Sequence, residues 1–156
     1  MTFGPEGAYG HTDHIAISQF TTAAVVAAAD PSWHLAGGPA EPHRVSKLYF
    51  IAWSAAKWAA YQAALKRLVV TVDGEERHVA PWPDWAITTV LDTSRVWPAV
   101  WRAVSCHKTQ MATYERLATL ADEHQRALWG TQEFYRAFSS VNGGRARETD
   151  LFEGLR

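Results

Sequence analysis

Two histidines flank an aspartate near the start of this 156-residue chain, in the run His11-Thr12-Asp13-His14. Imidazole and carboxylate groups are common zinc ligands, and catalytic zinc sites hold three protein ligands and leave one position open. Histidines three apart lie on one face of a helix or across its N-terminus, so both rings can face one point. A helix N-terminus also favours a nearby oxyanion. The run is a candidate metal site, although H-x-x-H pairs also arise by chance.

The composition is that of a globular domain, with 47% hydrophobic and 20% charged residues. A formal net charge of −1 gives no electrostatic basis for binding nucleic acid or an anionic membrane. The single cysteine, Cys106, excludes an internal disulfide and suits a reducing compartment. The N-terminus shows no signal-peptide pattern, and the longest apolar run, residues 22–29, is too short to span a bilayer. We therefore expect a cytoplasmic protein.

The eight tryptophans are spread over the chain with no fixed period. Most are expected to pack in the core or on the domain surface. A few could line a sugar site, because flat aromatic faces suit the apolar faces of sugars.

Local patterns place the candidate site at the start of a helix. Residues 1–10 are rich in glycine and proline and predict a loop. Apolar residues then recur at helical spacing to about Ala29, with Thr12 or Asp13 as the N-cap. Asp30-Pro31 ends this helix, because the residue before a proline disfavours helical geometry.

The rest of the chain alternates between strands and helices. The patterns predict a buried strand over residues 47–53, a Ser54-capped helix to about residue 67, a hairpin of residues 68–72 and 75–79 with Asp73-Gly74 at its turn, and a strand over residues 86–92. A long helical region from residue 93 or 94 to about 125 and a helix over about 131–138 follow. This order predicts one α/β domain over residues 1–156. Two candidate parallel strands and one hairpin are few for so many helices, so either the sheet is small or part of the domain is missing.

The segment around the two histidines resembles a known family signature. Residues 3–16 are similar, nearly residue for residue, to the G-x-Y-G-H-P-D-H-x-A signature of the PIG-L/LmbE deacetylases. Three later stretches resemble other family motifs in the same order: residues 47–50 its K-L-Y-[YFW], residues 107–110 its H-x-[ST]-Q, and residues 148–152 its tail. The chain is thus similar to the C-terminal part of that family, which implies a Rossmann-like α/β fold with its N-terminal strands missing.

The resemblance also implies a role for each residue of the signature. His14 matches a zinc ligand, and Asp13 matches the acidic residue that tunes a metal-ligand histidine. His11 matches the histidine that stabilises the tetrahedral oxyanion or protonates the leaving amine. Tyr9 matches a mobile tyrosine that closes on the substrate and can donate to the oxyanion. Thr12 replaces the family's proline, a mild change because threonine can cap a helix.

The implied activity is zinc-dependent de-N-acetylation of an N-acetylglucosamine-type substrate, a small-molecule amino sugar. The family's A-H-P-D-D-E motif, which supplies two zinc ligands and the general base, has no counterpart in this sequence. One ligand does not hold zinc tightly, so we expect weak or absent zinc binding and no activity from this chain alone.

Whether the chain is an enzyme therefore stays open at this point. The alternative is a shortened, non-catalytic relative that serves as a binding or interaction module. Missing strands would leave an open sheet edge and exposed apolar faces. Either the missing N-terminal half or a second copy, giving a homo-oligomer, is the expected partner.

Overall fold

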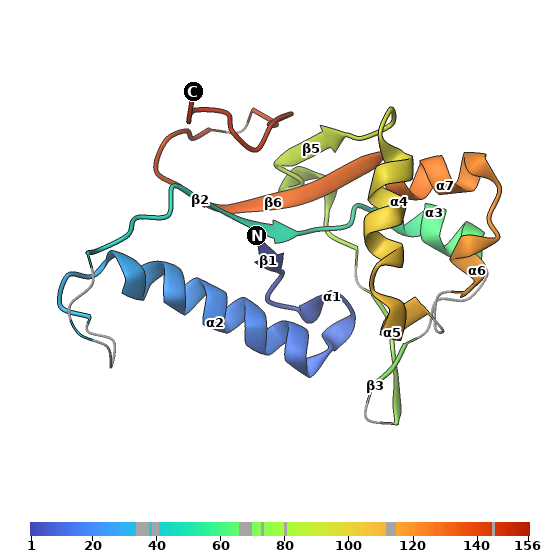
Figure 1. The fold of residues 1–156 in the computed structure, drawn as a ribbon, viewed down its shortest axis with the longest axis horizontal. Helices are drawn as coiled ribbons and strands as arrows, with labels where there is room; N and C mark the ends of the chain where they lie inside the picture. Colours follow the sequence, from blue (N-terminus) through green and yellow to red (C-terminus); the bar gives the residue numbers. More distant parts are fainter. Residues whose placement is uncertain are drawn as a thin grey trace.

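A four-stranded mixed sheet forms the centre of the computed structural model (Figure 1). The structure describes residues 1–33, 38, 41–65, 70–72, 74–79, 81–111, 115–144 and 146–156. The strand order is β1 (Thr2–Phe3), β2 (Lys47–Ile51), β6 (Thr131–Ser139) and β5 (Thr89–Asp92). β1 runs parallel to β2, whereas β6 is antiparallel to both β2 and β5. The α/β class predicted from the sequence is confirmed.

The helices lie in two groups, one along a side of this sheet and one beyond an end of its strands. Along one side runs α2 (Thr12–Ala29), preceded by the short α1 (Gly7–Gly10). Beyond the other end of the strands lie α3 (Ala55–Leu65), α4 (Trp97–Ser105), α5 (Lys108–Met111), α6 (Glu115–Ala118) and α7 (Asp122–Trp129). A separate hairpin of β3 (Val70–Val72) and β4 (Glu75–Arg77) stands apart from the four-stranded sheet, and a 3₁₀ turn covers Asp84–Ala86.

Several predicted elements are confirmed. The helix over residues 12–29 is present, but its N-cap is His11 instead of Thr12 or Asp13, because the His11 ring nitrogen accepts the Asp13 backbone N–H. Ser54 caps α3 by accepting the Lys57 N–H at 3.1 Å. The hairpin pairs Val72 with Glu75 around Gly74, whose φ is +82°; Asp73 lies outside the described residues.

The prediction of a helix over residues 131–138 is wrong, because this segment is the strand β6. Its sequence mixes helix-favouring Gln132 and Glu133 with aromatic residues. Pairing with β2 on one side and β5 on the other decides the outcome, a long-range effect that no local pattern contains. The two candidate parallel strands, β2 and β5, run in the same direction but are separated by β6.

Two other expectations hold only in part. The helical region predicted from residue 93 to about 125 is broken into α4, α5, α6 and α7. Side chains compete with the helical hydrogen bonds near two of the breaks: Ser105 donates to the Arg102 carbonyl and Thr119 to the Arg116 carbonyl. The predicted loop over residues 1–10 instead contains β1 and α1, because Thr2 and Phe3 pair with Phe50 and Ile51.

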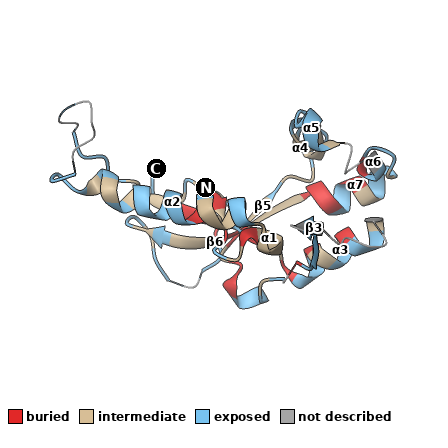
Figure 2. Cartoon of the chain, turned by 90° about the horizontal axis from the view of Figure 1, so that it is seen from below, coloured by how far each residue is buried: buried red, intermediate tan, exposed pale blue. Residues whose placement is uncertain are grey.

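The core has two parts. One lies on the sheet around Leu48, Tyr49 and Phe134. The other joins α3, α6 and α7 through buried Tyr61, Leu117, Leu128 and Trp129, against which Trp53, Trp58, Trp97 and Trp101 pack. Most tryptophans therefore pack internally, as predicted, while Trp33 and Trp85 are exposed. In Figure 2, burial concentrates where the sheet meets α3 and α7, and most of α2 is exposed.

A buried carboxylate ties the C-terminal tail to the sheet. Glu148 is 1% exposed, and its oxygens accept hydrogen bonds from Lys47 (2.7 Å), Tyr49 (2.9 Å), Thr89 (2.7 Å) and Asn142 (2.5 Å). The Arg136 guanidinium lies 2.9 Å from Oε1. Burial alone would raise the pKa of Glu148, but the hydrogen bonds outweigh it and lower the pKa to about 2. The tail is therefore part of the folded core.

Lys57 makes a comparable buried connection between helix and sheet. Its ammonium donates to the carbonyls of Leu128 (2.6 Å) and Thr131 (2.7 Å), where α7 ends and β6 begins. Burial lowers the pKa of Lys57, and the nearby charge of Glu133 opposes this shift.

No described helix is both long enough and apolar enough to cross a membrane.

Candidate functional site

The candidate site lies at the carboxyl end of β1, where the chain turns through α1 into α2. Three residues of this turn have positive φ: Gly7 (+67°), Ala8 (+65°) and Gly10 (+75°). A Cβ on Gly7 would lie 2.7 Å from Ile15 Cγ1, so the close approach of the turn to α2 requires glycine. Ala8 carries a side chain in a conformation that L-residues disfavour, a form of strain found at functional sites.

This turn brings four aromatic rings together. The His14 ring stacks on Phe3 with 3.8 Å between ring centroids and lies 4.7 Å from the His11 ring. Tyr9 meets the His14 ring edge-on at 5.2 Å. The structure thus brings Tyr9, His11 and His14 into one cluster, although it leaves their chemical roles untested.

His14 is held with one ring nitrogen facing the backbone. Its Nδ1 lies 3.2 Å from the Gly7 carbonyl oxygen, which can only accept, so Nδ1 carries the hydrogen. Nε2 then presents a lone pair, the orientation in which histidines bind metals. Burial lowers the pKa of His14, and the bond to Gly7 opposes this only in part. The half-buried ring is thereby kept neutral and able to donate a lone pair.

His11 is held in the opposite tautomer. Its Nδ1 accepts the Asp13 backbone N–H at 3.2 Å, so in the neutral ring the hydrogen is on Nε2. The two adjacent imidazoles therefore present different groups: His14 a lone pair and His11 an N–H donor. A lone pair suits a metal or a proton, and an N–H suits an oxyanion.

Asp13 occupies the first turn of α2 with an exposed side chain. The expectation that it tunes a metal-ligand histidine stays a prediction, and the His14 ring donates its Nδ1–H to the Gly7 carbonyl. Asp13 acts on His14 through its charge, which favours the protonated ring.

The residues present do not make a complete zinc site. Among the described residues, no three histidine, cysteine, aspartate or glutamate side chains converge on one point. Catalytic zinc sites use three protein ligands, so His14 supplies only part of such a set.

Two side chains near the turn could not be placed from the sequence. Arg77, from β4, lies over Gly10, where an added Cβ would be 3.5 Å from the guanidinium Nη1. Glu6 accepts a hydrogen bond from the indole of Trp82 at 2.9 Å. Both contacts join segments that are far apart in the chain. The only local signal for them is the Trp-Pro pair after the hairpin, which indicates that the chain turns at that point.

Replacing Gly7 by alanine is expected to lower the free energy of unfolding by about 1–3 kcal/mol, because it adds a clash with Ile15 and a disfavoured φ. Urea denaturation measures this change. The matched control is Gly143→Ala, at a glycine with open space around it and no positive φ. Equal stability of the two variants would contradict the tight turn described here.

Comparisons with known proteins give relatives of one kind, and no protein-family model matches the chain. A Rhodococcus jostii protein is 32% identical over 163 residues, which cover 99% of this chain and 54% of that protein. A Kineococcus radiotolerans protein is 34% identical, covering 45% of its length, and a Mycobacterium leprae protein is 30% identical, covering 54%. All three are named 1D-myo-inositol 2-acetamido-2-deoxy-alpha-D-glucopyranoside deacetylase.

The chain spans about half the length of the curated relatives it matches. The match runs over 99% of this chain, so it includes the histidine cluster, the sheet and the Glu148 tail. On these grounds the chain is homologous, over nearly its whole length, to part of the deacetylases of the PIG-L/LmbE family.

Proposed function

We propose that this chain is the C-terminal portion of a zinc-dependent de-N-acetylase that acts on an N-acetylglucosamine-type substrate. The observation that carries the proposal is the pair of opposite tautomers, with a lone pair on His14 and an N–H on His11. His14 serves as one zinc ligand and His11 as the donor to the oxyanion. The names of the relatives, which describe removal of the acetyl group from an acetamido sugar, support the same substrate class.

In amide hydrolysis, the chain's own residues would stabilise the oxyanion of the tetrahedral intermediate. The Nε2–H of His11 and the hydroxyl of Tyr9 donate to the oxygen that becomes negative in the tetrahedral intermediate. The leaving amine takes its proton from the acid formed when a general base deprotonates the attacking water, because neutral His11 would become an imidazolate if it gave up its Nε2 hydrogen. A general base and further metal ligands come from polypeptide outside this sequence, so the 156 residues alone are inactive.

The exposed surface around β1 supports a place for that polypeptide. Within the described residues β1 pairs only with β2, so its other edge has no strand partner, and exposed strand edges are normally paired or covered. Residues 15–29 of α2 include no charged side chain, and Phe20 and Val26 are 67% and 69% exposed. A groove of about 320 Å³ lies between α2 and the sheet, lined in part by Val25 and Leu48. Such apolar surface normally has a partner.

The added polypeptide is proposed to bring a parallel strand beside β1 and to complete a Rossmann-like sheet. Ligands in open α/β sheets bind beyond the carboxyl ends of the strands. A strand in that position would end close to His14, which is where the remaining ligands are needed.

The test joins this chain to the part of the Rhodococcus jostii relative that it does not match, by fusion or co-expression. The completed protein is expected to hold about one zinc per molecule and to release acetate from the substrate in that relative's name. The chain alone is expected to do neither. Metal analysis and an amine-release assay give both quantities. Stoichiometric zinc and turnover in the isolated chain, or neither in a stably folded completed protein, would refute the proposal.

A non-catalytic binding role is the second candidate, favoured by the incomplete ligand set of the described residues and by the uncovered apolar face. It predicts that the isolated chain self-associates through α2. Sedimentation of the isolated chain measures this self-association. Adding the missing polypeptide then distinguishes the two candidates, because a non-catalytic module should still have neither zinc nor turnover.

A further inference from the structure

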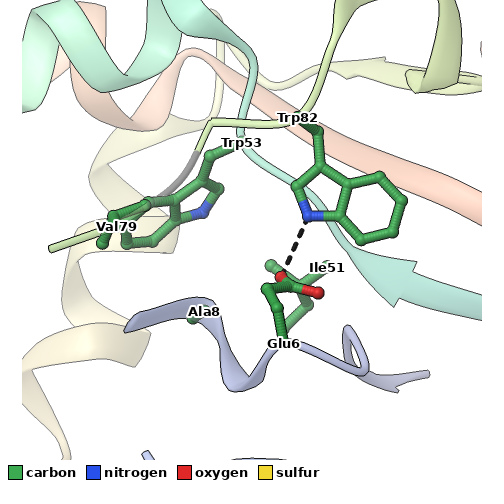
Figure 3. A pocket seen from close by; sticks show the side chains of 6 residues that line it. All are labelled: Glu6, Ala8, Ile51, Trp53, Val79 and Trp82. Carbon is green, nitrogen blue, oxygen red and sulfur yellow. Dashed lines mark hydrogen bonds between the residues drawn. The ribbon is translucent and has the colours of Figure 1, made fainter. Parts of the chain in front are cut away.

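The Glu6 carboxylate is positioned by one hydrogen bond and by the space that Gly4 leaves beside it. Its Oε1 accepts the Trp82 indole N–H at 2.9 Å, as Figure 3 shows. The carboxylate fills the space beside Gly4, where an added Cβ would lie 2.6 Å from Oε1 and 2.8 Å from Cδ. A side chain at residue 4 would therefore expel it. Gly4 thus leaves the room that the carboxylate occupies, and the Trp82 indole holds it there by a hydrogen bond.

The second carboxylate oxygen has no hydrogen-bond partner in the part of the chain that the structure describes. A small pocket opens beside it, lined by Glu6, Ala8, Ile51, Trp53, Val79 and Trp82 (Figure 3). Trp53 follows β2 and Glu6 follows β1, so the pocket lies at the carboxyl edge of the parallel pair. Ala8 lies in the same turn as Tyr9, so the pocket borders the turn that carries the histidine cluster.

The two tryptophans are held rigidly relative to each other. The Trp82 backbone N–H donates to the Trp53 carbonyl at 2.8 Å, and the Trp53 ring stacks on Tyr61 at 4.8 Å. A fixed carboxylate beside indole rings suits a polyhydroxylated ligand, because hydroxyls donate to the carboxylate and apolar ring faces pack on the indoles.

We propose that Glu6 is a substrate-binding residue, whose free oxygen accepts a hydrogen bond from a sugar hydroxyl while Trp82 fixes the carboxylate and Trp53 borders the sugar. The inference rests on the proposed function for the class of ligand, an N-acetylated amino sugar. It adds a subsite that binds the hydroxyl groups of the sugar, whereas the histidines are proposed to face its acetamide group.

A purely structural role for Glu6 makes a different prediction. In that case the bond to Trp82 only ties the turn of residues 4–10 to the segment after the hairpin. Glu6→Gln separates the two roles, because the amide oxygen still accepts the indole N–H but the carboxylate charge is lost. If Glu6 binds the sugar, Glu6→Gln should weaken sugar binding while the free energy of unfolding stays close to that of the unchanged chain.

The experiment titrates the full chain with N-acetylglucosamine and follows the tryptophan indole resonances by NMR. The Trp82 indole signal is expected to shift, and Glu6→Gln is expected to raise the Kd about tenfold, the effect of losing a charged hydrogen bond. Glu123→Gln, at a carboxylate that is 82% exposed, should leave the Kd unchanged.

An unchanged Kd in Glu6→Gln, or no sugar binding by the folded chain, would overturn the subsite. Reduced stability of Glu6→Gln with unchanged binding would assign Glu6 to a structural role alone. These failures leave the proposed function standing, since zinc content and acetate release of the completed protein test it separately.

Discussion

Glu148→Gln is expected to lower the free energy of unfolding by about 3–5 kcal/mol, the usual effect of removing one partner from a buried ion pair. The side chains of Lys47 and Arg136 are 3% and 8% exposed, and both cations lie against this carboxylate. Glutamine keeps the shape of the side chain but removes its charge. It also turns an NH₂ group toward donors that need an acceptor. Domains of this size are stable by only about 5–15 kcal/mol, so the variant should be close to unfolding.

Urea denaturation measures this loss, with Glu123→Gln as the control at an exposed carboxylate whose removal should change stability by less than about 0.5 kcal/mol. A change in Glu148→Gln as small as in the control would mean that Lys47 and Arg136 are solvated. Acid titration provides a second readout. The pKa of Glu148 is lowered from 4.5 to about 2, so the stability that it contributes is complete above pH 4.5 and is lost as the pH falls through 2. The variant should lack that part of the acid dependence.

The Glu148 cluster also shows where sequence analysis reaches its limit. Residues 148–152 resemble a family motif, yet the surrounding segment is polar and rich in turns, which is typical of a solvent-exposed tail. The burial of Glu148 follows from backbone pairing with Thr88 and Val90, far away in the chain. Elements with a strong local signal, such as α2, β2 and the hairpin, could be predicted. β6 could not, because pairing on both of its edges overrides its mixed propensity.

In the candidate site, too, some residues could be predicted from the sequence and others could not. Tyr9, His11 and His14 lie in one continuous segment, so the resemblance located all three, and a tight turn is enough to gather their rings. Glu6 is placed by its hydrogen bond to Trp82, which follows the hairpin, and Arg77 reaches Gly10 from the hairpin itself. Residue spacing within the turn does not predict either contact. The hydrogen bonds that fix the tautomers of His11 and His14 also require the folded turn.

The opposite tautomers predict that the two histidines fail in different ways in the completed protein. His14→Ala is expected to reduce zinc to background and abolish acetate release, because it removes the lone pair that faces the proposed metal. His11→Asn is expected to keep zinc and lower kcat by about 10²–10³, the effect of losing one donor to an oxyanion. Asparagine is chosen because it is a preferred N-cap and can still accept the Asp13 N–H, so α2 should remain capped.

Metal analysis and steady-state kinetics on the same preparations separate these effects, and His43→Ala, at an exposed histidine, serves as the control. Zinc retained in His14→Ala would exclude that residue as a ligand. Zinc lost in His11→Asn would mean that His11 binds the metal, which would require its Nε2 to present a lone pair and its Nδ1 to give up the bond from Asp13. Since one helix cap fixes the tautomer of His11, the division of labour between the two histidines depends on how α2 begins. That dependence is why a cap-preserving variant is a sharper test than alanine.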